Sequence, residues 1–136
     1  MASAAIELQK AIYGRLSSDA ALNAALGGEH VYDHAPAHVA FPYVTFGRTS
    51  IHDWSTGTED GNEHVFTIHV WSKAQGKSET LELMDMVRAR LHDAELTLSE
   101  HKLVNLREEF AEARFNEDIA VFHGIARFRA VTEPLD

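Results

Sequence analysis

The chain has 136 residues and a formal net charge of −9, from 21 Asp and Glu residues against 12 Lys and Arg residues. Its length fits one domain over residues 1–136, and the lack of cysteine excludes a disulfide framework, a thiolate nucleophile and a cysteine zinc site. The negative charge disfavours phosphate backbones and anionic lipids as partners, and no apolar run reaches the ~18–20 residues that cross a bilayer.

The N-terminal residues predict a helix and not a targeting peptide, because Glu7 precedes the first basic residue and no continuous apolar segment follows it. The default compartment is therefore the cytoplasm, or wherever a particle assembled there goes. Four apolar residues recur at helical spacing: Leu8, Ala11, Ile12 and Leu16. A break at residues 17–19 offers an N-cap, and a short helical turn over residues 20–26 ends at two glycines, 27 and 28.

The next segments predict strands. Val31 begins a short extended stretch, and residues 34–42 form a loop because Pro36 and Pro42 push their predecessors out of helical geometry. A period-two pattern then predicts one strand from Tyr43 and a second over about residues 64–71. The connection between them, DWSTGTEDGNE, has about eleven residues. That exceeds the two to five of a tight hairpin, which favours a functional loop or a loosely ordered one.

The C-terminal half predicts a helix followed by two long strands. Ser78 is placed to cap a helix that runs to about residue 93, with acidic residues in its first turn and basic residues near its end. The strands are expected over residues 103–115 and 119–132. Apolar residues lie on both faces of the last strand, whereas helices cover only one face of a sheet. The other face therefore needs a partner.

The resulting order is α-β-β-β-α-β-β. It predicts an α+β fold with one mostly antiparallel sheet of four to five strands and two main helices packed on one face.

Nine histidines raise the question of a metal site. His30, His34 and His38 would align on a helix, but a proline inside the run breaks it. His64 and His69 are five residues apart on one strand and so face opposite sides. We therefore favour scattered structural or surface histidines over a metal site, and we expect no cofactor.

Acid–base catalysis needs one carboxyl group in an apolar pocket and a second one in solvent. The carboxylates crowd in two places, on the long connection and on one strand: Asp53, Glu59, Asp60, Glu63, Glu108, Glu109 and Glu112. No apolar run surrounds either cluster, and no G-x-S-x-G, P-loop or dinucleotide glycine pattern occurs. We therefore expect no catalytic residue. A small metal- or ligand-binding α+β enzyme remains an alternative.

Arginines and tryptophans give weaker signals. Arg107, Arg127 and Arg129 are placed to pair with acidic residues across the last two strands, and they are too few for a nucleic-acid surface. Trp71 is a core candidate. Trp54 opens the acidic connection, where an indole is costly to expose, so it either anchors a neighbouring subunit or folds back on its own loop.

Three stretches together carry a resemblance to a known family: VYDHAP…FPYVTFG, DWST…GNEHVFTIHVWSKAQGKSE and HGIARFRAVTEP. They resemble the tail-completion, or tail-terminator, proteins of long-tailed phages over about residues 6–134. The most characteristic combination is H-x-W-S after a strand, followed by a Gly–Lys helix start. The resemblance is closest to the versions in gene transfer agents and prophages of α-proteobacteria.

The resemblance implies a structural virion protein, not an enzyme. The resemblance further implies a homo-oligomeric, hexameric ring that caps the head-proximal end of the tail tube, stops tube polymerisation and joins the head. The implied partners are the tail tube protein and head–tail connector proteins, with assembly in the bacterial cytoplasm and no membrane. A head–tail connector or stopper ring is the alternative.

Two expectations follow for the ring. DNA passes through the lumen without specific binding, which suits an acidic subunit and would be contradicted by a basic pore. The long connection contacts a neighbouring ring or tube subunit through five residues: Asp53, Trp54, Glu59, Asp60 and Glu63.

Overall fold

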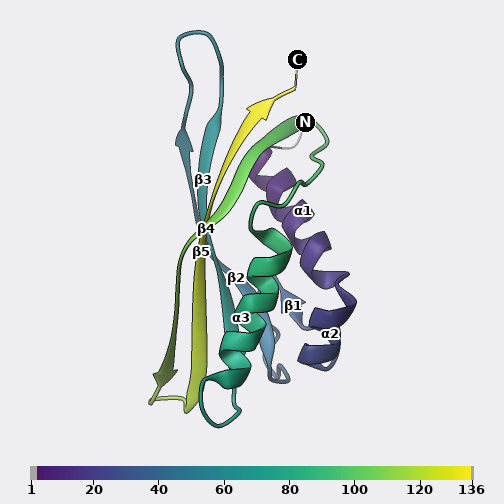
Figure 1. Cartoon of the computed structure of the whole chain (residues 1–136), viewed down its shortest axis with the longest axis vertical. Coiled ribbons are helices and arrows are strands. Elements are labelled where there is room, and N and C mark those ends of the chain that lie inside the picture. Colours follow the sequence, from purple (N-terminus) through teal and green to yellow (C-terminus); the bar gives the residue numbers. More distant parts are fainter. Residues whose placement is uncertain (1–2, 136) are drawn as a thin grey trace.

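The computed structural model describes residues 3–135, in which three helices lie on one face of a five-stranded sheet (Figure 1). The helices are α1 (Ala4–Ser17), α2 (Ala20–Leu26) and α3 (Ser78–Leu91). The strands are β1 (Val31–Tyr32), β2 (Tyr43–Asp53), β3 (Asn62–Ser72), β4 (His101–Asn116) and β5 (Val121–Pro134). The predicted α+β fold is confirmed, with α2 as a full helix where a helical turn was expected.

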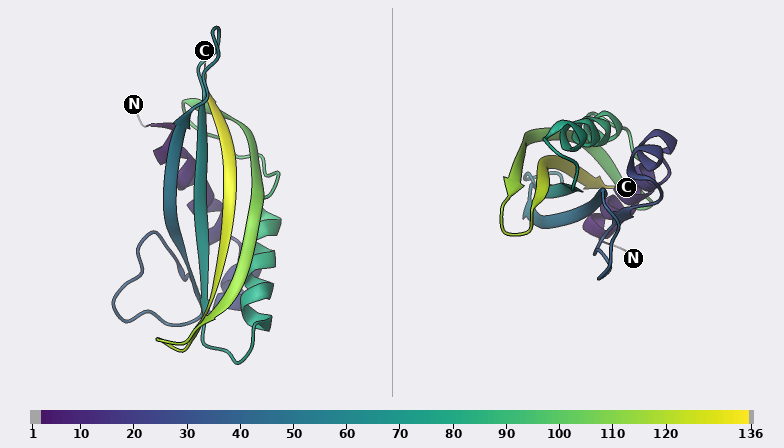
Figure 2. Two further views of the ribbon diagram at one scale, coloured as in Figure 1. Left: turned by 90° about the vertical axis from the view of Figure 1, so that its left-hand side faces the viewer. Right: turned by 90° about the horizontal axis from the view of Figure 1, so that it is seen from below.

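The strand order is β1-β2-β3-β5-β4, and every pair is antiparallel except β1 with β2. Helix α3 carries the chain across the sheet from β3 to β4, and β5 returns between them. This is a strand–helix–strand crossover. Seen from the side away from the helices, the long strands lie side by side with the helices behind them (Figure 2).

The core lies between the helices and alternate residues of the sheet. In β3 every second side chain is buried, as a strand covered on one face requires. Phe66 of β3 stacks on Phe128 of β5, with ring centroids 5.5 Å apart. The helices contribute a stripe of buried side chains that includes Leu8, Ile12, Leu16, Leu22, Leu26, Leu83, Val87 and Leu91.

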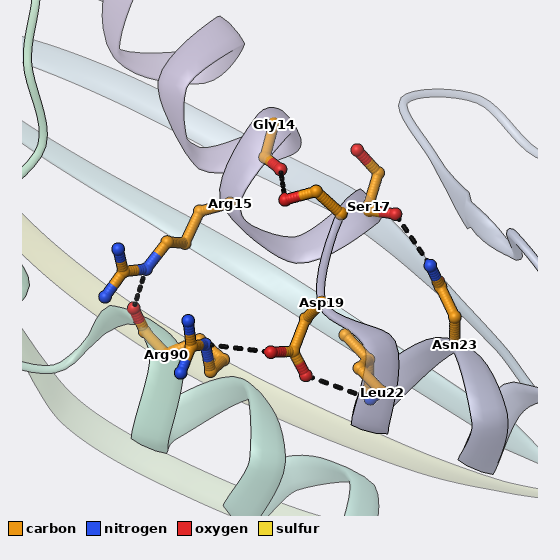
Figure 3. A network of polar contacts seen from close by, with 8 residues as sticks. Gly14, Arg15, Ser17, Asp19, Leu22, Asn23 and Arg90 are labelled. Atoms are coloured by element: carbon orange, nitrogen blue, oxygen red, sulfur yellow. Dashed lines mark hydrogen bonds and ion pairs between the residues drawn. The ribbon is translucent and has the colours of Figure 1, made fainter.

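Side-chain hydrogen bonds fasten the α1–α2 corner to the end of α3 (Figure 3). Asp19 caps α2 by accepting a hydrogen bond from the Leu22 N–H at 2.9 Å, and its other oxygen lies 3.1 Å from Arg90 Nε. Arg15 Nε donates to the Arg90 carbonyl at 3.1 Å. Helix α2 stops at Gly27, which has φ 81°. The predicted cap and the predicted glycine stop are both confirmed.

The start of α3 corrects a prediction. Lys77, not Ser78, is the N-cap residue, and no side chain caps the helix there. The first turn is held from another side, because Ser72 Oγ of β3 donates to Glu79 Oε1 at 2.6 Å.

The connection between the central strands is shorter than predicted. Asp53 pairs with Asn62, and His52 pairs with Glu63, so the antiparallel ladder continues beyond the end of the apolar alternation. Asp53 and Glu63 therefore belong to β2 and β3, and the loop covers residues 54–61. Among the helices of residues 3–135, none is long and apolar enough to cross a membrane.

Candidate functional site

The β2–β3 hairpin loop extends beyond the rest of the sheet at one end of the molecule (Figure 1). Every residue from Ile51 to Asp60 is exposed to solvent. The loop nevertheless has an ordered backbone, because the Trp54 N–H donates to the Gly61 carbonyl at 2.9 Å and the Thr56 N–H donates to the Glu59 carbonyl at 2.7 Å. A projecting, internally hydrogen-bonded loop is suited to contact another molecule without first being ordered.

Asp53 stabilises the base of this loop. Its Oδ1 accepts a hydrogen bond from the Ser55 N–H at 2.9 Å. Hydrogen bonds from Ser55 lower the pKa of the Asp53 carboxyl, because they stabilise its charged form. Asp53, the last residue of β2, thus stabilises the start of the loop with its carboxylate.

Trp54 and Glu63 meet through an arginine of β5. The guanidinium of Arg129 lies over the Trp54 ring at 4.8 Å from its centroid, and Arg129 Nε also donates to Glu63 Oε2. The indole remains 51% exposed. Trp54 therefore lies against Arg129 of β5, with its Cδ1 close to Gly61 of its own loop, and half of its surface is exposed.

The loop tip carries the two remaining predicted residues. Glu59 and Asp60 border a polar hollow together with Thr58, Glu133 and Pro134, which brings the end of β5 beside the tip. Three carboxylates therefore gather at this end of the molecule. Of the five predicted contact residues, Trp54, Glu59 and Asp60 lie in the projecting loop and Asp53 and Glu63 lie at its base.

A second cluster, on the sheet face away from the helices, was missed by the sequence analysis. His123 of β5 stacks on Trp71 of β3, with ring centroids 3.8 Å apart, and its Nε2 lies 2.6 Å from His69 Nδ1. His69 Nε2 also lies 3.0 Å from Thr67 Oγ1. Trp71 stacks further on Tyr43 and is only partly buried, so its expected place in the core is wrong.

Gly47 of β2 makes room for this cluster. A Cβ atom there would lie 2.1 Å from His69 Nε2 and 2.3 Å from Thr67 Oγ1. The two side chains therefore cross directly over the β2 backbone. On this part of the open face, the rings of Tyr43, Trp71 and His123 therefore pack on one another.

The histidine pair makes stability depend on pH. Burial lowers the pKa of His69. Burial also lowers the pKa of His123, and the positive charges of the nearby His69 and Arg114 act in the same direction, so that this pKa falls to about 4. An unfolded histidine titrates near 6.5. As pH falls below 6.5, these two histidines become protonated in the unfolded chain but stay neutral in the folded chain. The free energy of unfolding therefore decreases until about pH 4.

We expect this decrease to amount to about 1.4 kcal/mol per pH unit for each histidine that stays neutral. His123→Phe keeps a ring against Trp71 and removes one titrating group. The slope of its unfolding free energy against pH should therefore be smaller by about 1.4 kcal/mol per pH unit. Urea unfolding at pH 7, 5.5 and 4.5 measures both slopes. Equal slopes in the two proteins would show that His123 does not carry the effect.

The other histidines are dispersed. His64 is buried on the helix side and its Nε2 lies 2.9 Å from Thr132 Oγ1, so His64 and His69 face opposite sides as predicted. His34 and His38 are exposed in the loop after β1. Within residues 3–135, no three His, Asp or Glu side chains gather as they would around a metal ion.

Comparison with known proteins decides the family. The family model described as "Tail completion protein gp17" matches residues 10–133. The chain belongs to this family. One solved structure, titled "Virion of native gene transfer agent (GTA) particle", contains a chain that is 36% identical, with a TM-score of 0.87, over 98% of this chain and 99% of that one. No curated protein matches the sequence.

This tail completion protein is accordingly a structural component of a virion tail, and its role is not enzymatic. The features described above fit such a role, because they are surfaces: a projecting loop and an aromatic cluster on the open sheet face.

Proposed function

We propose that this protein is a tail terminator, one domain over residues 1–136 that forms a ring, hexameric in our proposal, at the head-proximal end of the tail tube. The ring stops tube polymerisation and provides the surface that joins the head. The observation that carries the proposal is the likeness over nearly the whole chain to a chain of a gene transfer agent virion. Its partners would be the tail tube protein on one side and head–tail connector proteins on the other.

The surface of the subunit supports this role. The large exposed apolar residues lie on several separate parts of the molecule, among them Ile6 and Tyr13 on α1, Ile51 on β2, Phe110 and Phe115 on β4, and Trp54 in the hairpin loop. A ring needs two different contact patches on each subunit, because its interface is heterologous. The net charge of −9 suits a lumen through which DNA passes without specific binding.

The hairpin loop supplies the test. In cells that make the particle, a variant with Trp54→Ser, Glu59→Ser and Asp60→Ser should give tails of uncontrolled length or heads without tails. The variant should still fold, because these side chains are exposed and the Arg129–Trp54 contact is worth only about 0.5–1 kcal/mol. Electron microscopy measures tail length, and urea unfolding of the purified variant measures folding.

A matched control changes the same kinds of residue on the exposed side of α3: Leu81→Ser, Glu82→Ser and Asp85→Ser. It should give tails of normal length. Normal particles from the hairpin variant would count against a role of this loop in assembly.

A further inference from the structure

An apolar groove of about 600 Å³ runs beside β2, between α1 and the segment around β1. Ile6 and Tyr13 of α1 line one wall, and Val31 and Tyr32 of β1 line the other. Thr49 of β2 also borders it, so the groove lies along the outer edge of that strand.

This edge of β2 is unpaired over most of its length. Strand β1 pairs only with Val44 and Thr45. From residue 46 to residue 53, no described residue forms a strand pair on the outer side of β2. A free strand edge beside an apolar wall is the arrangement that binds an added β-strand, with main-chain hydrogen bonds for affinity and side-chain pockets for specificity.

The opposite edge of the sheet has a matching free segment. The α3–β4 connection covers the first half of β4, where the Asp93 N–H donates to the Leu106 carbonyl and Thr97 pairs with Lys102. Beyond Glu108, no described residue pairs with the outer edge of β4. This free part carries Phe110 and Phe115, each 45% exposed.

The side chains of this segment suit the groove. On the helix side of the sheet, β4 presents Ala111, Ala113 and then Phe115, which pair with Ala126, Gly124 and Phe122 on that face of β5. Small residues let a strand lie close beneath α1, and the phenylalanine provides the apolar surface that the tyrosines of the groove can cover. The free part of β4 in a second copy of the chain can thus pair with the free edge of β2 and fill the groove.

Strand direction also favours a second copy. Strands β2 and β4 are separated by β3 and β5, and every step between neighbours is antiparallel, so β2 and β4 run in opposite directions. Copies related by rotation about one axis keep the sense of their strands. The β4 edge of one copy therefore meets the β2 edge of the next in antiparallel orientation, and the pairing repeats around a ring.

The free segments are staggered by an amount that allows closure. Residues of β3 give a common scale for the two edges. The free part of β2 pairs with residues 62–68 of β3, and residues 110–115 of β4 are level, through β5, with residues 67–72 of β3. The midpoints differ by four to five residues, which is about 15 Å along the strands, whereas four strand spacings measure about 19 Å. This stagger corresponds to a strand tilt of about 38°, within the ~35–45° of closed barrels.

We propose that β4 of each copy adds to β2 of the next copy beneath α1, so that the sheets of all subunits join into one closed sheet. This inference rests on the proposed ring and specifies the contact that closes it. The chain has no cysteine, which makes a disulfide test clean.

The test uses particles that carry Thr49→Cys together with Ala111→Cys, or Thr49→Cys with Ala113→Cys to sample the neighbouring register. After mild oxidation, a non-reducing gel should show a ladder of covalent multimers that ends at the full ring. Thr49→Cys with Ala89→Cys, which lies on the exposed side of α3, is the control and should give no ladder. Each single variant should give dimers at most.

Hydrogen exchange of the wild-type protein provides a second reading that needs no substitution. The amides of residues 48–53 and 109–116 should both exchange at least tenfold more slowly in particles than in the isolated chain. Rings seen at the head-proximal end without a ladder, or with slowing in only one of the two segments, would overturn the pairing and leave the terminator proposal intact. Absence of the chain from that position would instead overturn the proposed function.

Discussion

Replacing Phe128 by alanine is expected to destabilise the fold by about 3–5 kcal/mol. Phe128 is fully buried, stacks on Phe66 and lies on the β5 face that the helices cover. Its removal leaves a cavity between sheet and helices that the surrounding side chains fill only in part. Because a domain is stable by only about 5–15 kcal/mol, much of the chain should be unfolded or aggregated at 37 °C.

Urea unfolding of the purified protein measures this loss. Phe115→Ala is the matched control, because the same ring is removed from a site that is half exposed in the isolated chain. It should cost less than about 1 kcal/mol. Similar losses for both variants would show that the core does not lie where the packing of α1, α3 and β5 places it.

Gly124→Val is expected to be the second most damaging change. A Cβ atom at this position of β5 would lie 2.5 Å from Met84 Sδ and 3.0 Å from Thr80 Cγ2, so α3 rests directly on the strand backbone. Met84 can move aside, but Thr80 is β-branched and fully buried. Overpacking of this kind costs about 1–3 kcal/mol, and a valine adds two further methyl groups that press α3 away from the sheet.

Two further variants separate crowding from a general intolerance of substitution. Gly57→Ala, in the hairpin loop, meets no atom within 4 Å and should change stability by less than about 0.5 kcal/mol. Met84→Ala combined with Gly124→Ala should be less destabilised than the sum of the two single variants, because the space vacated by the sulfur accepts the new methyl group. Strict additivity would argue against direct contact between Gly124 and Met84.

Local patterns predicted much of the fold. The period-two alternation around Phe66 and Phe128 predicts which face is buried, and this depends only on strand geometry. Asp19 and Gly27 predict a helix start and a helix stop for equally local reasons. Strand ends were less predictable, because main-chain pairing of Asp53 with Asn62 continues without any apolar signal.

Long-range features were not predictable in this way. His69 and His123 are 54 residues apart, and they meet only because β5 returns next to β3 in one particular register. For the same reason Trp71 was a core candidate, although its stacking partners lie on the other face. Arg127 of β5 pairs with Glu109 of β4, as predicted. Arg129 of β5 pairs instead with Glu63 of β3, because β5 lies between β3 and β4, and the sequence pattern does not predict that strand order.

A partner was predicted for the open face of the sheet, and this stays a prediction. Rings from Tyr43, Trp71 and His123 cover one another on that face. The large exposed apolar side chains lie mainly at the two sheet edges, on α1 and in the hairpins. This distribution supports the proposed contacts between copies at the sheet edges.

We propose that this protein ends the tail as a ring between the tube and the head. Cryo-electron microscopy of purified particles can test this proposal, because it shows both the position and the number of copies. We predict one ring of this chain per particle, at the head-proximal end of the tube. Copies repeated along the tube, or located only at the distal tip, would contradict the claim.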